Sequence, residues 1–123
     1  MGDETVAAQV GQAWRYQREG QAESAIKEFE KILYQNPDDI DANYGMGLAQ
    51  RTAGYLQAAV QYFQHALDIV DQKDSAGRLA REAAANESQT ERLKPNTAED
   101  DRYMMLTRML KQRIAEINAT LPN

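Results

Sequence analysis

The sequence contains no cysteine in its 123 residues, which excludes disulfide bridges and thiolate chemistry. It holds only three prolines and seven glycines, so most of the chain is free to form helices. No apolar run approaches the roughly 20 residues that cross a bilayer, and we expect no membrane-spanning segment. His65 is the single histidine, so any serine–histidine catalysis would have to centre on this residue.

Basic residues are outnumbered, because 14 lysines and arginines stand against 19 aspartates and glutamates. The resulting formal net charge of −5 weighs against a nucleic-acid surface, since phosphate binding requires clustered lysine and arginine. The first residues, Met-Gly-Asp-Glu-Thr, lack the basic and then apolar order of a secretory signal. We therefore expect a cytoplasmic protein that binds neither nucleic acid nor a membrane.

What the sequence does contain is an internal repeat with a spacing of 34 residues. A fixed period of this length predicts stacked supersecondary units, which usually bind other chains rather than perform chemistry. A glycine, an alanine and a phenylalanine recur at the same mutual spacing in the two copies, as Gly20, Ala25 and Phe29 and then as Gly54, Ala59 and Phe63.

Apolar residues at helical spacing predict four helices in this repeated region, over residues 6–19, 22–35, 40–53 and from about 56 onward. The inward faces of the second and fourth helices are predicted to be Ala22, Ala25, Ile26, Phe29, Ile32 and Leu33, and Ala59, Val60, Phe63, Ala66, Leu67 and Val70.

The ends of these helices are predicted from glycine, proline and aspartate. Gly20 and Gly54 end the first and third helices, because glycine readily adopts the left-handed backbone of a tight turn. Pro37 ends the second helix, since it disfavours a helical conformation in its predecessor. Asp38 or Asp39 then caps the third helix.

The residues after the repeats differ in character. Within 74–97, we expect alanines to extend the fourth helix to about residue 84 and a polar, mobile loop to follow. Residues 98–121 predict a long capping helix, with Asn96 or Thr97 as its N-cap. Its apolar stripe comprises Tyr103, Leu106, Leu110, Ile114 or Arg113, Ile117 and Leu121, and Met105 and Met109 widen it.

These residues resemble the tetratricopeptide repeat family, with repeats at 6–39 and 40–73. The glycine, alanine and phenylalanine of both copies match the family pattern, as do the small residues Ala13 and Gly47. The sequence departs from the pattern where Gln50 replaces a usual aromatic and Asp71 replaces a usual proline. Gln9, Gln12 and Asn43 also stand where apolar residues are common.

The resemblance implies an all-α fold: a single domain, 1–123, in which two antiparallel helical hairpins stack and a long C-terminal helix closes the stack. It also implies a non-catalytic protein–protein interaction module without cofactor or metal. In this family a peptide or helix binds in a concave groove lined by the first helix of each repeat. The groove residues expected here are Val10, Trp14, Gln17, Arg18, Tyr44, Leu48 and Arg51.

Two alternatives apply to this groove. Trp14 and Tyr44 could instead belong to the core or lie beneath the chain's own C-terminal helix. Some family members clamp the terminal carboxylate of heat-shock chaperones with polar side chains. Val10, Trp14 and Gly45 occupy the corresponding positions here, so we do not expect that clamp.

Methionines in the capping helix suggest an alternative function, because methionine is adaptable and enriched at interaction surfaces. The chain would then be a scaffold that homodimerises through the C-terminal helix or the groove. Core packing of the same side chains is the competing interpretation. The residues concerned are Tyr103, Met104, Met105 and Met109.

His65 is better explained as part of a solvated helix face than as a catalytic base, although Asp68 follows one turn later. Helix capping already accounts for Asp38, Asp39 and Asp41, which could otherwise be taken for a metal cluster. The sequence therefore predicts no catalytic, cofactor or metal residues.

Overall fold

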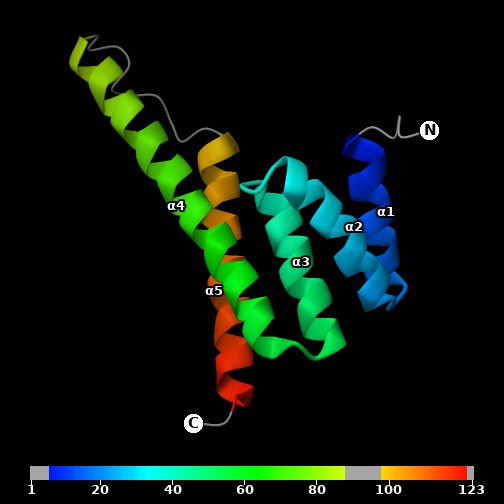
Figure 1. Ribbon diagram of the computed structural model, residues 1–123. Coiled ribbons are helices and arrows are strands. Elements are labelled where there is room, and N and C mark those ends of the chain that lie inside the picture. The colour runs from blue at the N-terminus through cyan, green and yellow to red at the C-terminus, as the bar shows by residue number, and fades with distance from the viewer. Residues whose placement is uncertain (1–5, 88–97, 122–123) are drawn as a thin grey trace.

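The computed structural model of the protein describes residues 6–87 and 98–121. All regular secondary structure in these ranges is helical, which confirms the all-α prediction. Figure 1 shows the five helices: α1 (Val6–Arg18), α2 (Ala22–Gln35), α3 (Ile40–Ala53), α4 (Leu56–Glu87) and α5 (Ala98–Thr120).

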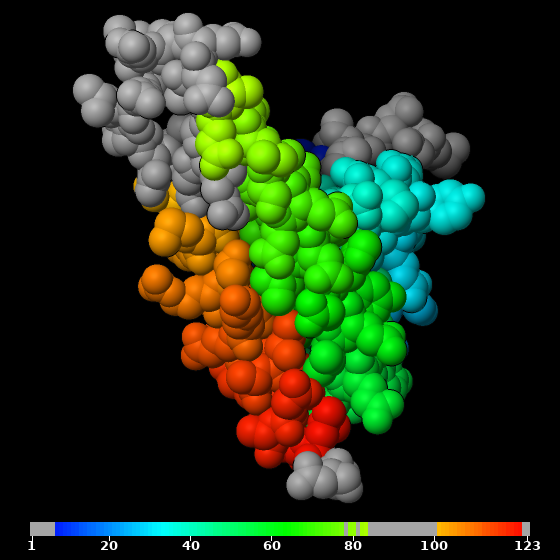
Figure 2. Space-filling model, turned by 90° about the vertical axis from the view of Figure 1, so that its left-hand side faces the viewer, coloured from blue at the N-terminus to red at the C-terminus, as the bar shows by residue number. Residues whose placement is uncertain are grey.

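The helices pack in chain order. α1 packs against α2, α2 against α3, α3 against α4 and α4 against α5, while α1 also contacts α3. α1 and α2 form one hairpin and α3 and α4 form a second, and α5 lies along α4 at the end of the stack (Figures 1 and 2). The two hairpins therefore contact each other where α1 and α2 of the first hairpin pack against α3 of the second.

The predicted helix ends are confirmed in the three short turns. Gly20 and Gly54 have φ values of 76° and 92°, in the left-handed region that favours glycine. The Gly54 N–H is donated to the carbonyls of Gln50 and Arg51, as at a helix C-terminus. Asp39, rather than Asp38, caps α3, because its side chain accepts a 2.8 Å hydrogen bond from the Ala42 N–H.

The two repeated phenylalanines lie at the centre of the packing, and both are fully buried. Each ring lies against a glycine of α3, so that a Cβ atom on Gly45 would overlap Phe29 and one on Gly47 would overlap Phe63. Phe29 thus joins the first hairpin to the second, whereas Phe63 joins α4 to α3 of its own hairpin. These contacts require glycine on α3 at two positions.

The core forms two clusters of buried residues. The first lies mainly among α1, α2 and α3 and contains Ala13, Ala25, Ile26, Phe29, Ile32, Ala42, Met46 and Ala49. The second lies mainly between α4 and α5 and contains Ile40, Ala59, Phe63, Ala66, Leu67, Ile69, Val70, Tyr103, Leu106, Leu110 and Ile117. Both clusters bury residues that the helical periodicity predicted to face inward.

Asn43 corrects one interpretation of the sequence, which treated it as a weak match to an apolar position. Only 2% of the residue is exposed, and its side-chain amide donates to the carbonyls of Pro37 and Asp39 at 3.0 and 2.8 Å. These bonds hold the turn between α2 and α3, because both amide hydrogens are used within it. The buried polar residue is therefore a structural element of the turn.

The C-terminal part also differs in detail from the prediction. α4 continues to Glu87, slightly beyond the expected end near residue 84. Met105 was wrongly expected to widen the buried stripe of α5, because the residue is 57% exposed. The first residues of the predicted mobile loop, 85–87, are instead helical, and the rest of that loop and the N-cap at Asn96 or Thr97 lie outside the described residues.

The described residues carry neither a membrane-spanning helix nor a metal cluster. Within 6–87 and 98–121, no helix combines the length and apolar character needed to cross a membrane. In the same part of the chain, no three histidine, cysteine, aspartate or glutamate side chains gather as a metal site would require.

Candidate protein-interaction face

The structure brings together two aromatic residues predicted to line a groove. Trp14 of α1 and Tyr44 of α3 lie with their ring centroids 6.4 Å apart and their planes 34° apart. Both residues are half-buried. We call the surface formed by these two helices the α1/α3 face, defined by the seven expected residues Val10, Trp14, Gln17, Arg18, Tyr44, Leu48 and Arg51.

Both aromatic rings are held by the buried phenylalanines. Trp14 meets Phe29 edge-on, with centroids 5.3 Å apart and an interplanar angle of 84°. Tyr44 meets Phe63 at 5.7 Å and 51°. Because the phenylalanines are fixed in the core, Trp14 and Tyr44 have little freedom to move. The core and surface interpretations of these residues therefore both hold in part, since each ring packs against a core phenylalanine and each residue is only half-buried.

Two apolar residues extend this arrangement. Val10 packs against the first core cluster and Leu48 against the second, and both are half-buried. The two residues flank the aromatic pair in sequence, each four residues from it on its own helix. The α1/α3 face thus has an apolar centre contributed by both repeats.

A hydrogen bond connects the same two helices near their C-terminal ends. The Gln17 side-chain amide donates to the Thr52 hydroxyl at 3.1 Å. The Thr52 hydroxyl in turn donates to the Leu48 carbonyl at 3.0 Å. Gln17 therefore helps to hold α1 against α3 in addition to lying on the face.

The charged residues of the face differ in their surroundings. Arg18 is exposed, whereas the half-buried Arg51 forms an ion pair with Glu116 of α5 at 3.2 Å. Arg102 of α5 likewise reaches Asp41 of α3 at 3.3 Å. These two ion pairs connect α5 to α3, and the sequence pattern did not predict either pairing.

The four residues predicted for self-association separate into two groups. Tyr103 is only 9% exposed and belongs to the second core cluster. Met104 and Met105 are 56% and 57% exposed, and Met109 is half-buried. The core and surface interpretations of this helix thus apply to different side chains, because adjacent residues on a helix point in different directions.

His65 lies on the surface, as the sequence predicted. Its Nε2 atom is 3.3 Å from Oδ1 of Asp38, and the two side chains are 48% and 74% exposed. Asp68, the acid one turn away, instead accepts a hydrogen bond from Gln64 at 3.0 Å. This pairing links α4 to the turn before α3 and does not resemble a buried catalytic pair.

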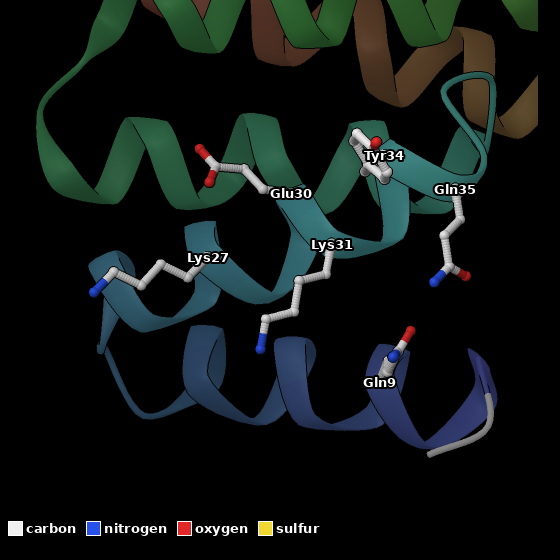
Figure 3. A pocket seen from close by; sticks show the side chains of 6 residues that line it. All are labelled: Gln9, Lys27, Glu30, Lys31, Tyr34 and Gln35. Carbon is white, nitrogen blue, oxygen red and sulfur yellow. The ribbon is translucent and has the colours of Figure 1, made fainter. Parts of the chain in front are cut away.

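A surface hollow lies between α1 and α2 and has a volume of about 520 Å³. Figure 3 shows Gln9 of α1 opposite residues of α2, among them Lys31 and Gln35. Tyr34 on its border is 90% exposed, and Lys31 pairs with Glu28. Because long, solvated side chains line this hollow, it is a weaker candidate than the aromatic α1/α3 face.

One family of known proteins matches this chain. The sequence model described as tetratricopeptide repeat matches residues 8–39 and 40–69. The first range coincides closely with the first helical hairpin, the second covers α3 and the first part of α4, and together they cover half of the chain. Neither a curated protein nor a solved structure matches significantly.

Proposed function

Because the chain belongs to the tetratricopeptide repeat family, whose repeats generally mediate protein–protein interaction, we propose that it is a non-catalytic adaptor that binds a peptide or helix on the α1/α3 face. The observation that carries this proposal is the pair of half-buried aromatic residues, Trp14 and Tyr44, whose rings contact those of Phe29 and Phe63. Rigid aromatic side chains are typical anchors of binding sites, because little conformational entropy is lost when they bind.

The chemistry of the face indicates the kind of partner. Its centre would accept an apolar side chain between Trp14 and Leu48, while the exposed Arg18 at the border would favour an acidic group. Arg51 is less available, since it already pairs with Glu116. An amphipathic helix or extended peptide that carries an apolar anchor followed by an acid fits these features. We place this interaction in the cytoplasm, in line with the absence of cysteine.

Selection of peptides from a random displayed library tests the proposal without knowledge of the natural partner. Trp14 is the only tryptophan, so its fluorescence reports directly on the face. We expect selected peptides to change the emission of Trp14 and to protect it from quenching by iodide. Peptides that bind without affecting either signal would contradict the proposed site.

Two variants make this test specific. Trp14→Ala is expected to lose binding, but it also removes packing on Phe29 and lowers stability. Arg18→Glu avoids the loss of packing because Arg18 is exposed. This variant should raise the dissociation constant for acidic peptides by about tenfold. Lys27→Glu on α2 makes the same charge change at another exposed residue and should leave binding unchanged. Equal loss in both charge variants would indicate a nonspecific electrostatic effect.

A second function, self-association as a scaffold, is favoured by a separate observation. Met104 and Met105 of α5 are both more than half exposed, and both lie outside the α1/α3 face. Exposed apolar patches commonly mark interaction sites. We propose that these side chains contact a second copy of the chain.

A further inference from the structure

α5 stands at the end of a regular series. α1 packs with α2 and α3 packs with α4, so each of these first helices has a second helix that follows it in the chain. α5 packs along α4 and reaches α3 through two ion pairs, and no described helix follows it.

A furrow runs between α4 and α5 on the surface and has a volume of about 400 Å³. Acidic residues line it on α4 and basic residues line it on α5, with Met104 as its exposed apolar side chain. Figure 2 shows the two helices lying lengthwise against each other. The lining residues are Asp71, Asp74, Met104, Thr107, Arg108 and Lys111.

We propose that α5 of a second copy docks antiparallel against α5 at this furrow. This arrangement rests on the self-association proposed above and is independent of the α1/α3 face. It creates a symmetric interface in which the same surface of both copies is used.

The charge pattern of α5 fits this orientation. Asp101, Met104, Arg108 and Lys111 follow one another at spacings of three, four and three residues, which places them on one stripe of the helix. All four are exposed. A two-fold axis between Met104 and Arg108 sets Asp101 of each copy opposite Lys111 of the other. It also lays each Met104 against the aliphatic stem of the opposite Arg108.

These charges complement each other between copies rather than within one helix. Asp101 and Lys111 are ten residues apart, which corresponds to about 15 Å along a helix and is too far for a direct ion pair. A parallel arrangement would set Asp101 opposite Asp101 and Lys111 opposite Lys111, which is repulsive. The antiparallel arrangement therefore forms the Asp101–Lys111 ion pair twice, once at each end of the interface.

The interface is expected to be weak. One pair of helices buries less surface than a standard stable protein–protein interface. Exposed ion pairs each contribute little, and salt screens them. We therefore expect reversible dimers at micromolar concentrations that dissociate further as ionic strength increases.

Sedimentation velocity at low ionic strength, over a series of micromolar concentrations, measures this equilibrium. The wild-type chain should pass from monomer to dimer. Asp101→Lys or Lys111→Asp alone should each raise the dissociation constant about tenfold or more, because each creates two like-charged pairs in the symmetric dimer. Lys27→Asp on α2 serves as the charge-matched control and should leave the equilibrium unchanged.

Mixing the two single variants gives the decisive result. In the mixed dimer the introduced lysine meets the introduced aspartate, and the remaining native pair is intact, so dimerisation should return close to the wild-type level. The double variant should be restored in the same way. Circular dichroism of every variant verifies that the helical fold is retained.

The outcomes separate the two proposals. A wild-type chain that stays monomeric at all concentrations overturns both self-association and the antiparallel arrangement. A dimer that is unaffected by either charge variant, or that mixing does not restore, overturns the antiparallel arrangement while self-association through another surface survives. Neither result affects peptide binding on the α1/α3 face, which is measured by Trp14 fluorescence.

Discussion

The second helices of the two repeats, α2 and α4, begin alike and end differently. Each places an alanine and a phenylalanine at full burial, at the same interval of four residues. α2 stops after 14 residues, where Asn36 and Pro37 follow, and the chain turns back into α3. α4 continues for 32 residues, and Asp71 stands where the equivalent proline would be.

The difference shows that repeat packing and repeat length are controlled by separate residues. Buried residues of α4 occur only up to Val70, and the described side chains beyond it are exposed or half-buried. The extension is therefore not required by the core that the two repeats share. Pro37 and the Asp39 and Asn43 hydrogen bonds follow the shorter helix, and we infer that they end it, because proline disfavours continuation of a helix.

The buried phenylalanines that α2 and α4 share have the largest expected effect on stability. Phe29→Ala and Phe63→Ala should each lower the free energy of unfolding by about 3–5 kcal/mol, because both rings are fully buried. Chemical denaturation followed by circular dichroism measures this loss. Because α2 packs on α3, we expect one cooperative transition in both variants. A separate transition for each hairpin would show that the repeats unfold independently.

The difference between the helices is tested by giving α4 the missing proline. Asp71→Pro should lower the free energy of unfolding by about 3 kcal/mol or more, since proline lacks the N–H that the helix uses and its ring clashes with the carbonyl one turn earlier. Helical content measured by circular dichroism should also fall. Asp71→Ala is the matched control, because Asp71 is exposed and alanine favours a helix. Unchanged helicity in the proline variant would mean that this residue does not determine the length of α4.

The contacts of the two phenylalanines can also be tested by substituting the glycines of α3 that they touch. Gly45→Ala and Gly47→Ala should each destabilise the fold by about 1–3 kcal/mol, because the added methyl group overlaps Phe29 or Phe63. At Gly11 on α1, an added Cβ would meet no atom within 4 Å, so Gly11→Ala should stabilise the helix by about 1 kcal/mol. Thermal unfolding that shows equal effects at all three glycines would contradict this packing.

A smaller effect concerns a second hydrogen bond that connects the two hairpins at the surface, besides the one between Gln17 and Thr52. The Tyr55 hydroxyl donates to Glu23 of α2 at 3.1 Å. This hydrogen bond, and then the charge of Glu23, raise the pKa of Tyr55 above its ordinary value near 10. The folded state favours the neutral phenol of Tyr55. The hydrogen bond therefore contributes fully to the stability of the fold below the ordinary pKa, and this contribution is lost as the pH rises through the raised pKa.

An absorbance titration of phenolate formation measures this shift, with Tyr55→Phe used to identify the signal of Tyr55. Glu23→Gln should bring the pKa of Tyr55 back toward its ordinary value. An unchanged titration in Glu23→Gln would contradict the stated cause. The stability difference between the wild type and Tyr55→Phe should disappear at strongly alkaline pH.

Much of the fold could be predicted from local patterns. The glycines with positive φ, the proline after α2 and the helical spacing of apolar residues act over a few positions, so the sequence displays them directly. The buried role of Asn43 was missed because it depends on two carbonyls in the preceding turn. A polar residue at an apolar repeat position, shortly after a turn, is the signal that could have indicated it.

The candidate site could be predicted only in part. The repeat pattern identified Trp14 and Tyr44, but the sequence could not say how far each ring packs inward. The pairing of Arg51 with Glu116, 65 residues later, has no local signal at all. Long-range ion pairs depend on how helices are placed in space, and that placement is the sum of many contacts.

By itself the sequence determined a two-repeat helical stack, because the period of 34 residues and the turn residues are local and repeated. The tertiary structure decided which side chains of that stack remain accessible. It buried Tyr103 and exposed Met104 and Met105, and it packed the half-buried Trp14 and Tyr44 against buried phenylalanines. The physical reason is that burial depends on which faces of separate helices meet, and neighbouring residues on one helix point in different directions.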